Sequence, residues 1–137
     1  MSRPASPPVP GPGAGAGGAP DPAGLRRDYR SGFLDEADLA PTWVDQFRLW
    51  YADACQPEAG IPEPNAMIFA TADAQGRPSA RTVLLKGFDA RGFVLFTNYA
   101  SRKGQQVAAN PHGSLVFPWY PLERQVVVIG SVERLPR

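Results

Sequence analysis

The fold prediction rests first on the stretch AMIFATADAQGRPSARTVLLKGFDARGFVLFTN, residues 66–98. It holds three short apolar runs separated by two turns, and each turn begins with Asp and ends with Gly. Apolar runs of this length, bounded by such turns, are typical of β-strands joined in hairpins. The stretch therefore predicts three antiparallel strands, over 66–72, 78–88 and 92–98.

The sequence that follows extends this pattern. Apolar runs over 113–120 and 123–135 predict a fourth and a fifth strand, the last with a bulge at Gly130. Between the third and fourth strands, residues 101–110 predict a short helix with Ser101 as its N-cap. Short strands joined by tight turns predict a mainly β fold, a small antiparallel β-barrel with flanking helices.

A second helix is predicted ahead of the strands, where Thr42 is the expected N-cap. Trp43, Phe47, Trp50 and Ala54 recur at helical spacing and lie on one face. We expect this face to pack on the sheet. Cys55, at the end of the helix beside the same stripe, is expected to serve packing rather than chemistry.

The ends of the chain differ from its centre. Residues 1–24 are rich in Pro, Gly and Ala and contain no aromatic residue, so we expect a disordered tail there and a folded part over 25–137. A strand that runs almost to residue 137 leaves an open sheet edge. Because closing a barrel usually needs further strands, we expect the barrel to be truncated at its C-terminus.

Composition excludes several classes of protein. The single cysteine and the single histidine, His112, exclude an internal disulfide and a cysteine-based or multi-histidine zinc site within one chain. A net charge of +1 provides no general attraction to nucleic acid. No apolar run approaches the roughly 20 residues of a membrane span, and no secretory signal is evident. We expect a cytoplasmic protein with no metal.

Polar residues in the second strand form the first candidate site. By strand alternation, Arg81 lies on one face and Lys86 on the other, at opposite ends of an apolar run. Two interpretations remain open. Both cations end in water, as charged side chains usually do, or they bracket an anion at the barrel rim.

The predicted helix after the third strand favours the anion. Its first turn carries Arg102 and Lys103, where free backbone N–H groups and the helix dipole attract phosphate. Thr97 offers a hydroxyl just before it. Gln125 opens the last strand and is either a hydrogen-bonding partner for a planar ligand or a polar residue at a strand start. A phosphate-bearing heteroaromatic ligand suits these groups.

Six motifs then identify a family. The chain resembles the N-terminal part of the pyridoxamine 5′-phosphate oxidases, the FMN enzymes of vitamin B6 metabolism, over about residues 25–137. The motifs are RRDY (26–29), ARTVLLKGFD (80–89), FTN (96–98), SRK (101–103), FPW (117–119) and ERQVVVIG (123–130).

The resemblance implies an FMN-binding split β-barrel that works as a homodimer, with FMN at the subunit interface. It implies oxidation of pyridoxamine or pyridoxine 5′-phosphate to pyridoxal 5′-phosphate, with O2 as acceptor and H2O2 as product. The cofactor-binding residues that it implies are Arg81, Thr82, Val83, Leu84, Leu85, Lys86, Phe96, Thr97, Arg102, Lys103 and Gln125. The substrate-binding residues that it implies are Lys86, Arg26, Arg27, Asp28 and Tyr29.

The family's main residues for the substrate phosphate lie beyond position 137. For this chain by itself we therefore expect weak FMN binding and little turnover. Two alternatives stay open: another flavin split-barrel oxidoreductase, such as a phenazine-type oxidase, and a non-catalytic flavin-binding fragment.

Overall fold

The computed structural model describes residues 18–25, 34–98 and 100–136. The chain divides into two units, Met1–Arg30 and Ser31–Arg137. In the first unit the described residues are exposed and hold one 3-10 turn, Pro22–Gly24. The predicted tail otherwise lies outside the described residues. The core and the candidate site both belong to the second unit.

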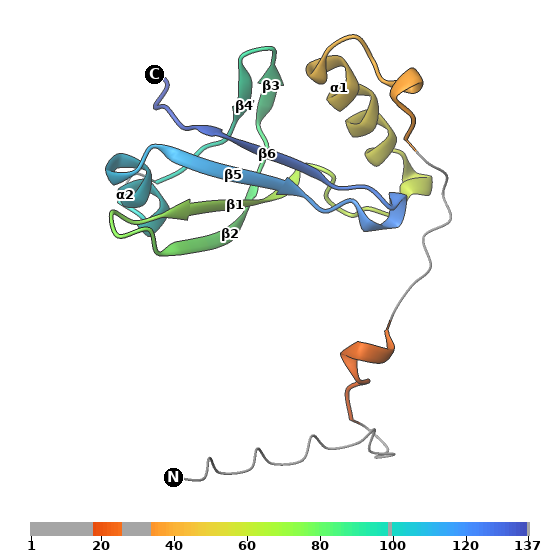
Figure 1. Cartoon of the computed structure of the whole chain (residues 1–137), viewed down its shortest axis with the longest axis horizontal. Helices are drawn as coiled ribbons and strands as arrows, with labels where there is room; N and C mark the ends of the chain where they lie inside the picture. Colours follow the sequence, from red (N-terminus) through yellow and green to blue (C-terminus); the bar gives the residue numbers. More distant parts are fainter. Residues whose placement is uncertain (1–17, 26–33, 99, 137) are drawn as a thin grey trace, which may run out of the picture. The chain divides into compact units, whose positions relative to one another are not determined.

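The described part of the second unit is mainly β, as expected, and its strands form two antiparallel sheets (Figure 1). The larger sheet has the order β2-β1-β5-β6, so β2 and β6 are its edges. The smaller is a hairpin of β3 and β4. The strands are β1 (Ala66–Ala72), β2 (Pro78–Leu84), β3 (Gly87–Asp89), β4 (Gly92–Val94), β5 (His112–Phe117) and β6 (Val126–Ser131).

The predicted strand over 78–88 is wrong in extent, because the chain changes partner in its middle. β2 pairs with β1 only as far as Leu84. The Leu85 N–H then donates to the Asn65 carbonyl (2.8 Å), whereas the Lys86 N–H donates to the Val94 carbonyl (2.8 Å). The chain thus leaves the large sheet and enters the β3–β4 hairpin. The strand predicted to reach residue 98 likewise ends early, with β4.

The two later strands are also shorter than predicted. β5 stops before a 3-10 turn, Tyr120–Leu122, and Glu123 then takes a left-handed backbone conformation (φ 56°). The Arg124 N–H donates back to the Trp119 carbonyl (3.2 Å). Residues held in this turn cannot extend, so β6 begins only after Gln125.

The bulge predicted at Gly130 is absent from β6. This strand pairs with β5 in unbroken register, with Gly113 opposite Gly130. A Cβ atom at Gly113 would lie 2.8 Å from Cε2 of Phe69. The glycine at position 113 therefore allows the Phe69 ring to pack closely against β5, and the hydrogen-bonded pairing of β5 and β6 continues past it.

The first long helix, α1 (Trp43–Ala54), begins as predicted, because the Thr42 hydroxyl accepts a hydrogen bond from the Asp45 N–H (3.2 Å). Its Phe47 ring is 4% exposed and packs edge-on against rings of the small hairpin, 4.7 Å from Phe88 and 4.9 Å from Phe93 between centroids. The expectation for Cys55 is wrong, since this residue is exposed just past the helix.

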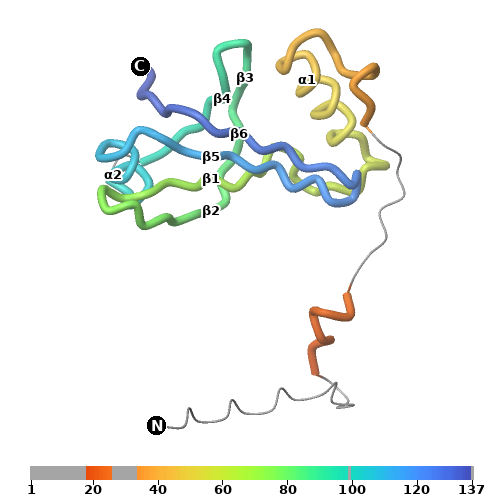
Figure 2. Tube along the Cα trace, in the orientation of Figure 1, coloured from red at the N-terminus to blue at the C-terminus, as the bar shows by residue number. Residues whose placement is uncertain are grey.

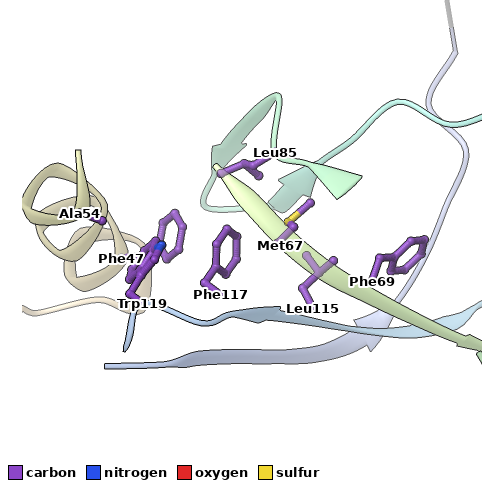
Figure 3. Packing of buried hydrophobic residues seen from close by; sticks show 8 residues of the cluster. All are labelled: Phe47, Ala54, Met67, Phe69, Leu85, Leu115, Phe117 and Trp119. Atoms are coloured by element: carbon purple, nitrogen blue, oxygen red, sulfur yellow. The ribbon is translucent and has the colours of Figure 1, made fainter. Parts of the chain in front are cut away.

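Figure 3 shows how the core runs from α1 along the inner face of the large sheet. Alternate residues of β1 and β5 point into it, because successive side chains of a strand face opposite sides. The buried apolar cluster consists of Phe47, Ala54, Met67, Phe69, Leu85, Leu115, Phe117 and Trp119.

The second helix, α2 (Arg102–Ala109), has Ser101 as N-cap, as predicted. It contacts β1 and lies at the end of the sheet where β1 turns into β2 (Figures 1 and 2). None of the helices described in the structure has the length and apolar character needed to cross a membrane.

Candidate functional site

The candidate site is built around Arg81 on the inner face of β2. Burial alternates along this strand, which confirms the predicted division into two faces. Arg81 and Val83 are half-buried and Leu85 is buried in the core, whereas Thr82, Leu84 and Lys86 are exposed on the other side. The implied cofactor stretch 81–86 thus presents side chains to two different faces of the sheet.

The Arg81 guanidinium is held by neutral acceptors from two strands. Its Nη1 donates to the Phe69 carbonyl (3.0 Å) and to the Thr71 hydroxyl (2.8 Å). Its Nη2 donates to the Ser79 hydroxyl (2.7 Å). Both hydroxyls donate onward to Oε1 of Gln106, over 2.5 Å and 2.8 Å respectively. The group therefore ties α2 to β1 and β2.

The charge of Arg81 has no acidic partner in the described residues. Burial lowers the pKa of its guanidinium, and the nearby positive charge of Arg102 lowers it further. Both effects penalise the charged form, and a bound anion would offset both. A guanidinium with a second cation nearby and no acidic partner of its own is a candidate anion site.

The N-terminus of α2 adds to this positive potential. The Ser101 hydroxyl accepts from the Gly104 N–H (3.3 Å) and donates to the Asn98 carbonyl (2.6 Å). Arg102 and Lys103 fill the first turn, where the helix dipole disfavours cations unless an anion is present. The phosphate-binding role expected of Arg102 and Lys103 stays a prediction.

A cleft opens beside these residues, between α2 and the β1–β2 turn. Its volume is about 530 Å³. One of its cations, Arg77, is already paired with Asp73 (2.7 Å), so Arg102 remains the cation there that has no ion pair among the described residues. The cleft is lined by Asp73, Arg77, Pro78, Ser79, Arg102, Gln105, Gln106 and Ala109.

Thr97 carries a second unmet polar group. Its Oγ1 is buried and has no hydrogen-bond partner in the described structure. A buried hydroxyl without a partner costs about 1–3 kcal/mol, so its persistence calls for an explanation. A ligand atom beside Thr97 would supply one. The neighbouring Phe96 is 75% exposed.

The remaining predicted residues are less closely connected. Lys86 and Gln125 are exposed, and no hydrogen bond or ion pair described for the chain links them to Arg81 or Arg102. Residues 26–29, the implied substrate segment Arg26, Arg27, Asp28 and Tyr29, lie outside the described residues. The binding roles assigned to all these positions stay predictions.

Sequence reasoning missed the hydroxyl and amide groups that hold Arg81. Ser79 lies two residues before Arg81, so strand alternation places both on one face and could have identified it. Thr71 is 3% exposed and is the polar residue among the buried positions that alternate along β1. A polar residue at a position predicted to be buried could have been noticed in the sequence. Gln106 had no such signal, because only packing of α2 brings it to the strands.

The chain also matches known proteins in sequence. Residues 56–137 match the family model described as "Pyridoxamine 5'-phosphate oxidase". A pyridoxine/pyridoxamine 5′-phosphate oxidase from Frankia casuarinae is 69% identical over 118 residues, which are 86% of this chain and 44% of that protein. The chain thus spans about half the length of the curated relatives that it matches.

Two solved structures share the fold. PhzG from Burkholderia lata, in complex with tetrahydrophenazine-1-carboxylic acid, matches with TM-score 0.65 and 28% identity over 72% of this chain and 49% of its own. A pyridoxamine 5′-phosphate oxidase-related, FMN-binding protein from Nostoc punctiforme matches with TM-score 0.53 and 25% identity over 69% and 48%. The described sheet and helices are therefore part of a split β-barrel, and the chain belongs to the pyridoxamine 5′-phosphate oxidase family.

Proposed function

We propose that this chain is the cofactor-binding half of an oxidase that converts pyridoxamine or pyridoxine 5′-phosphate to pyridoxal 5′-phosphate, with FMN as cofactor and O2 as electron acceptor. Family membership supports the oxidase class. The substrate and the production of H2O2 are inferred for the whole protein, about half of which this chain represents.

The observation that carries the proposal is the uncompensated positive charge of Arg81 beside Arg102. Arg102 lies in the first turn of α2, and its positive charge lowers the pKa of the Arg81 guanidinium, which has no acidic partner among the described residues. A phosphate monoester carries close to two negative charges at neutral pH and accepts several hydrogen bonds, so it matches this group in charge and geometry.

The residues present fit FMN, whose isoalloxazine ring would supply the two-electron redox chemistry. Arg81, Arg102 and Lys103 would hold its phosphate. The buried Thr97 hydroxyl would gain the partner that it lacks. β2 is a sheet edge in the described structure, so its free backbone groups would meet polar atoms at the edge of a flavin.

We further propose that the whole protein is a homodimer. The outer face of the large sheet exposes apolar side chains that a monomer would rarely leave in water. Ile129 is 82% exposed, Val127 52% and Leu84 37%. These residues lie on the face opposite the buried cluster, where a second copy of the sheet would cover them.

A phenazine-type oxidase is the second candidate, because the PhzG structure matches this chain with a higher TM-score than the Nostoc punctiforme protein does. The described residues of this chain favour a phosphate-bearing cofactor for both candidate oxidases. The two candidates differ in their substrate. A panel containing pyridoxine 5′-phosphate, pyridoxamine 5′-phosphate and a dihydrophenazine acid, assayed with the full-length parent, would decide by which compound yields peroxide.

The cofactor proposal is tested on the chain itself. The chain is incubated with FMN, passed over a size-exclusion column, and the absorbance of the main peak is recorded in the visible range. We expect a flavin band in the wild type and in Arg48→Gln, an exposed control on α1, and a loss of at least about tenfold in FMN affinity for Arg81→Gln. A colourless wild-type peak, or equal binding by both variants, would contradict the proposed role of this half.

A further inference from the structure

One atom of Gln106, on α2, is linked to Arg81 through two hydroxyl groups. Its Oε1 accepts from the hydroxyls of Thr71 and Ser79. These two hydroxyls in turn accept from Nη1 and Nη2 of Arg81. The four side chains form a closed ring of hydrogen bonds that joins two strands to a helix.

The direction of every bond in this ring is determined by chemistry. A guanidinium can only donate, so each hydroxyl must accept from it and has its own proton left to donate. Both protons then require an acceptor. The amide oxygen of Gln106 meets this need with its two lone pairs, and the ring is fully satisfied.

For these two bonds, the difference between a glutamine and a glutamate that concerns Arg81 is charge, because either side chain offers an oxygen that accepts. A carboxylate at position 106 would accept the same two bonds, but it would also neutralise Arg81. The acceptors that Arg81 contacts directly are likewise neutral, a carbonyl and two hydroxyls. Three N–H groups of the guanidinium are used in this way, which leaves two of its five donors for a ligand.

We propose that Gln106 is a positioning residue for phosphate binding. It locks the Arg81 guanidinium through the Thr71 and Ser79 hydroxyls, while leaving its positive charge uncompensated for the phosphate of a monoester ligand. This inference rests on the proposed cofactor function, because it assigns the anion to the flavin phosphate. Gln106 acts indirectly in this proposal, and Arg81 is the residue of the ring that contacts the ligand.

The first test needs no flavin. In the ¹⁵N-labelled chain, the Nη resonances of Arg81, assigned with an Arg81→Lys variant, report rotation about the Cζ–Nη bonds. We expect resolved Nη protons in the wild type and in Gln56→Met, a control on an exposed glutamine past the end of α1. We expect their collapse into an averaged signal in Gln106→Met, which keeps the side-chain length but has no amide oxygen.

The second test separates orientation from charge. The affinity of each variant is measured for FMN and for riboflavin, which lacks the phosphate. Gln106→Met should lose about tenfold in FMN affinity and change less than about twofold for riboflavin. Gln106→Glu should keep the resolved Arg81 resonances, since its carboxylate accepts both bonds, but should also lose FMN selectively because it neutralises the cation.

Three results would overturn the inference: averaged Arg81 resonances in the wild type, resolved resonances in Gln106→Met, or equal losses for FMN and riboflavin in that variant. Circular dichroism and thermal midpoints show whether Gln106→Met folds. If it does not, the Arg81 resonances of the wild type and the FMN and riboflavin affinities of Gln106→Glu still test the role of Gln106. A wild-type chain that binds no flavin contradicts the proposed cofactor function, whereas the resonances of Arg81 judge the role of Gln106 independently.

Discussion

Replacing Thr97 with valine should make the ligand-free protein more stable and its flavin binding weaker. The Thr97 hydroxyl is buried without a partner among the described residues, and a buried unsatisfied hydroxyl costs about 1–3 kcal/mol. Valine has nearly the same shape, removes this cost and buries a methyl group in its place. We expect the free energy of unfolding to rise by about 1–2 kcal/mol.

The same substitution at Thr71 provides the matched comparison. This hydroxyl is also buried, but it accepts from Arg81 and donates to Gln106. Thr71→Val removes one hydrogen bond from Arg81 and one from Gln106, although each keeps its bond to Ser79, and should lower the free energy of unfolding by about 1–3 kcal/mol. The two identical exchanges thus have opposite expected signs.

The measurement is urea unfolding followed by tryptophan fluorescence, with equal m-values as the condition for comparing midpoints. FMN affinity is measured in parallel, and Thr97→Val should lose about tenfold if its hydroxyl meets the ligand. A Thr97→Val variant that is destabilised, or one that shifts in the same direction as Thr71→Val, would refute the assignment of an unmet hydroxyl.

Other expectations concern the core, the sheet and one turn. Phe47→Ala should lower the free energy of unfolding by about 3–5 kcal/mol in calorimetry, because this ring is 4% exposed among other aromatic rings. Trp43 is 50% exposed, so Trp43→Ala should lower it by about 1 kcal/mol. Equal losses would contradict the placement of Phe47 in the core. Gly113→Ala should destabilise by about 1–3 kcal/mol because of its 2.8 Å approach to a phenyl ring, and the cross-strand partner Gly130→Ala, with nothing within 4 Å, should tolerate the change. Hydrogen bonds from the turn backbone and a guanidinium hold the pKa of Asp73 below its usual range. The ionised Asp73 carboxylate therefore stabilises the fold at a pH above its pKa in the unfolded chain. This stabilisation is lost as the pH falls through its pKa in the folded chain, so the stability difference between the wild type and Asp73→Asn should disappear in acid. A difference that persists in strong acid would exclude this cause.

Local features of the fold could be predicted from the sequence. Thr42 and Ser101 cap their helices as predicted, because an N-cap depends on a side chain and the backbone a few residues away. The turn over 73–76 and the two faces of β2 were equally readable, since turn residues and strand alternation are properties of adjacent positions. Six motifs in order also identified the family.

Only tertiary structure decided where the strands end and what holds the site. β2 stops at Leu84 because the chain changes partner just beyond it: the Leu85 N–H still bonds to Asn65, next to β1, whereas the Lys86 N–H bonds to Val94. The pattern that predicted one strand over 78–88 continues across this change and did not show it. Cys55 borders an apolar stripe and is nevertheless exposed, whereas the preceding residue, Ala54, is fully buried.

The candidate site divides in the same way. The positive residues Arg81, Arg102 and Lys103 were visible in the sequence, because charge belongs to the residue type. The orientation of Arg81 was not, since it depends on Thr71 and Gln106, which lie 35 residues apart and meet only when α2 docks against β1. Hydrogen bonds act over about 3 Å, so their partners are determined by the packing of elements and not by the order of residues.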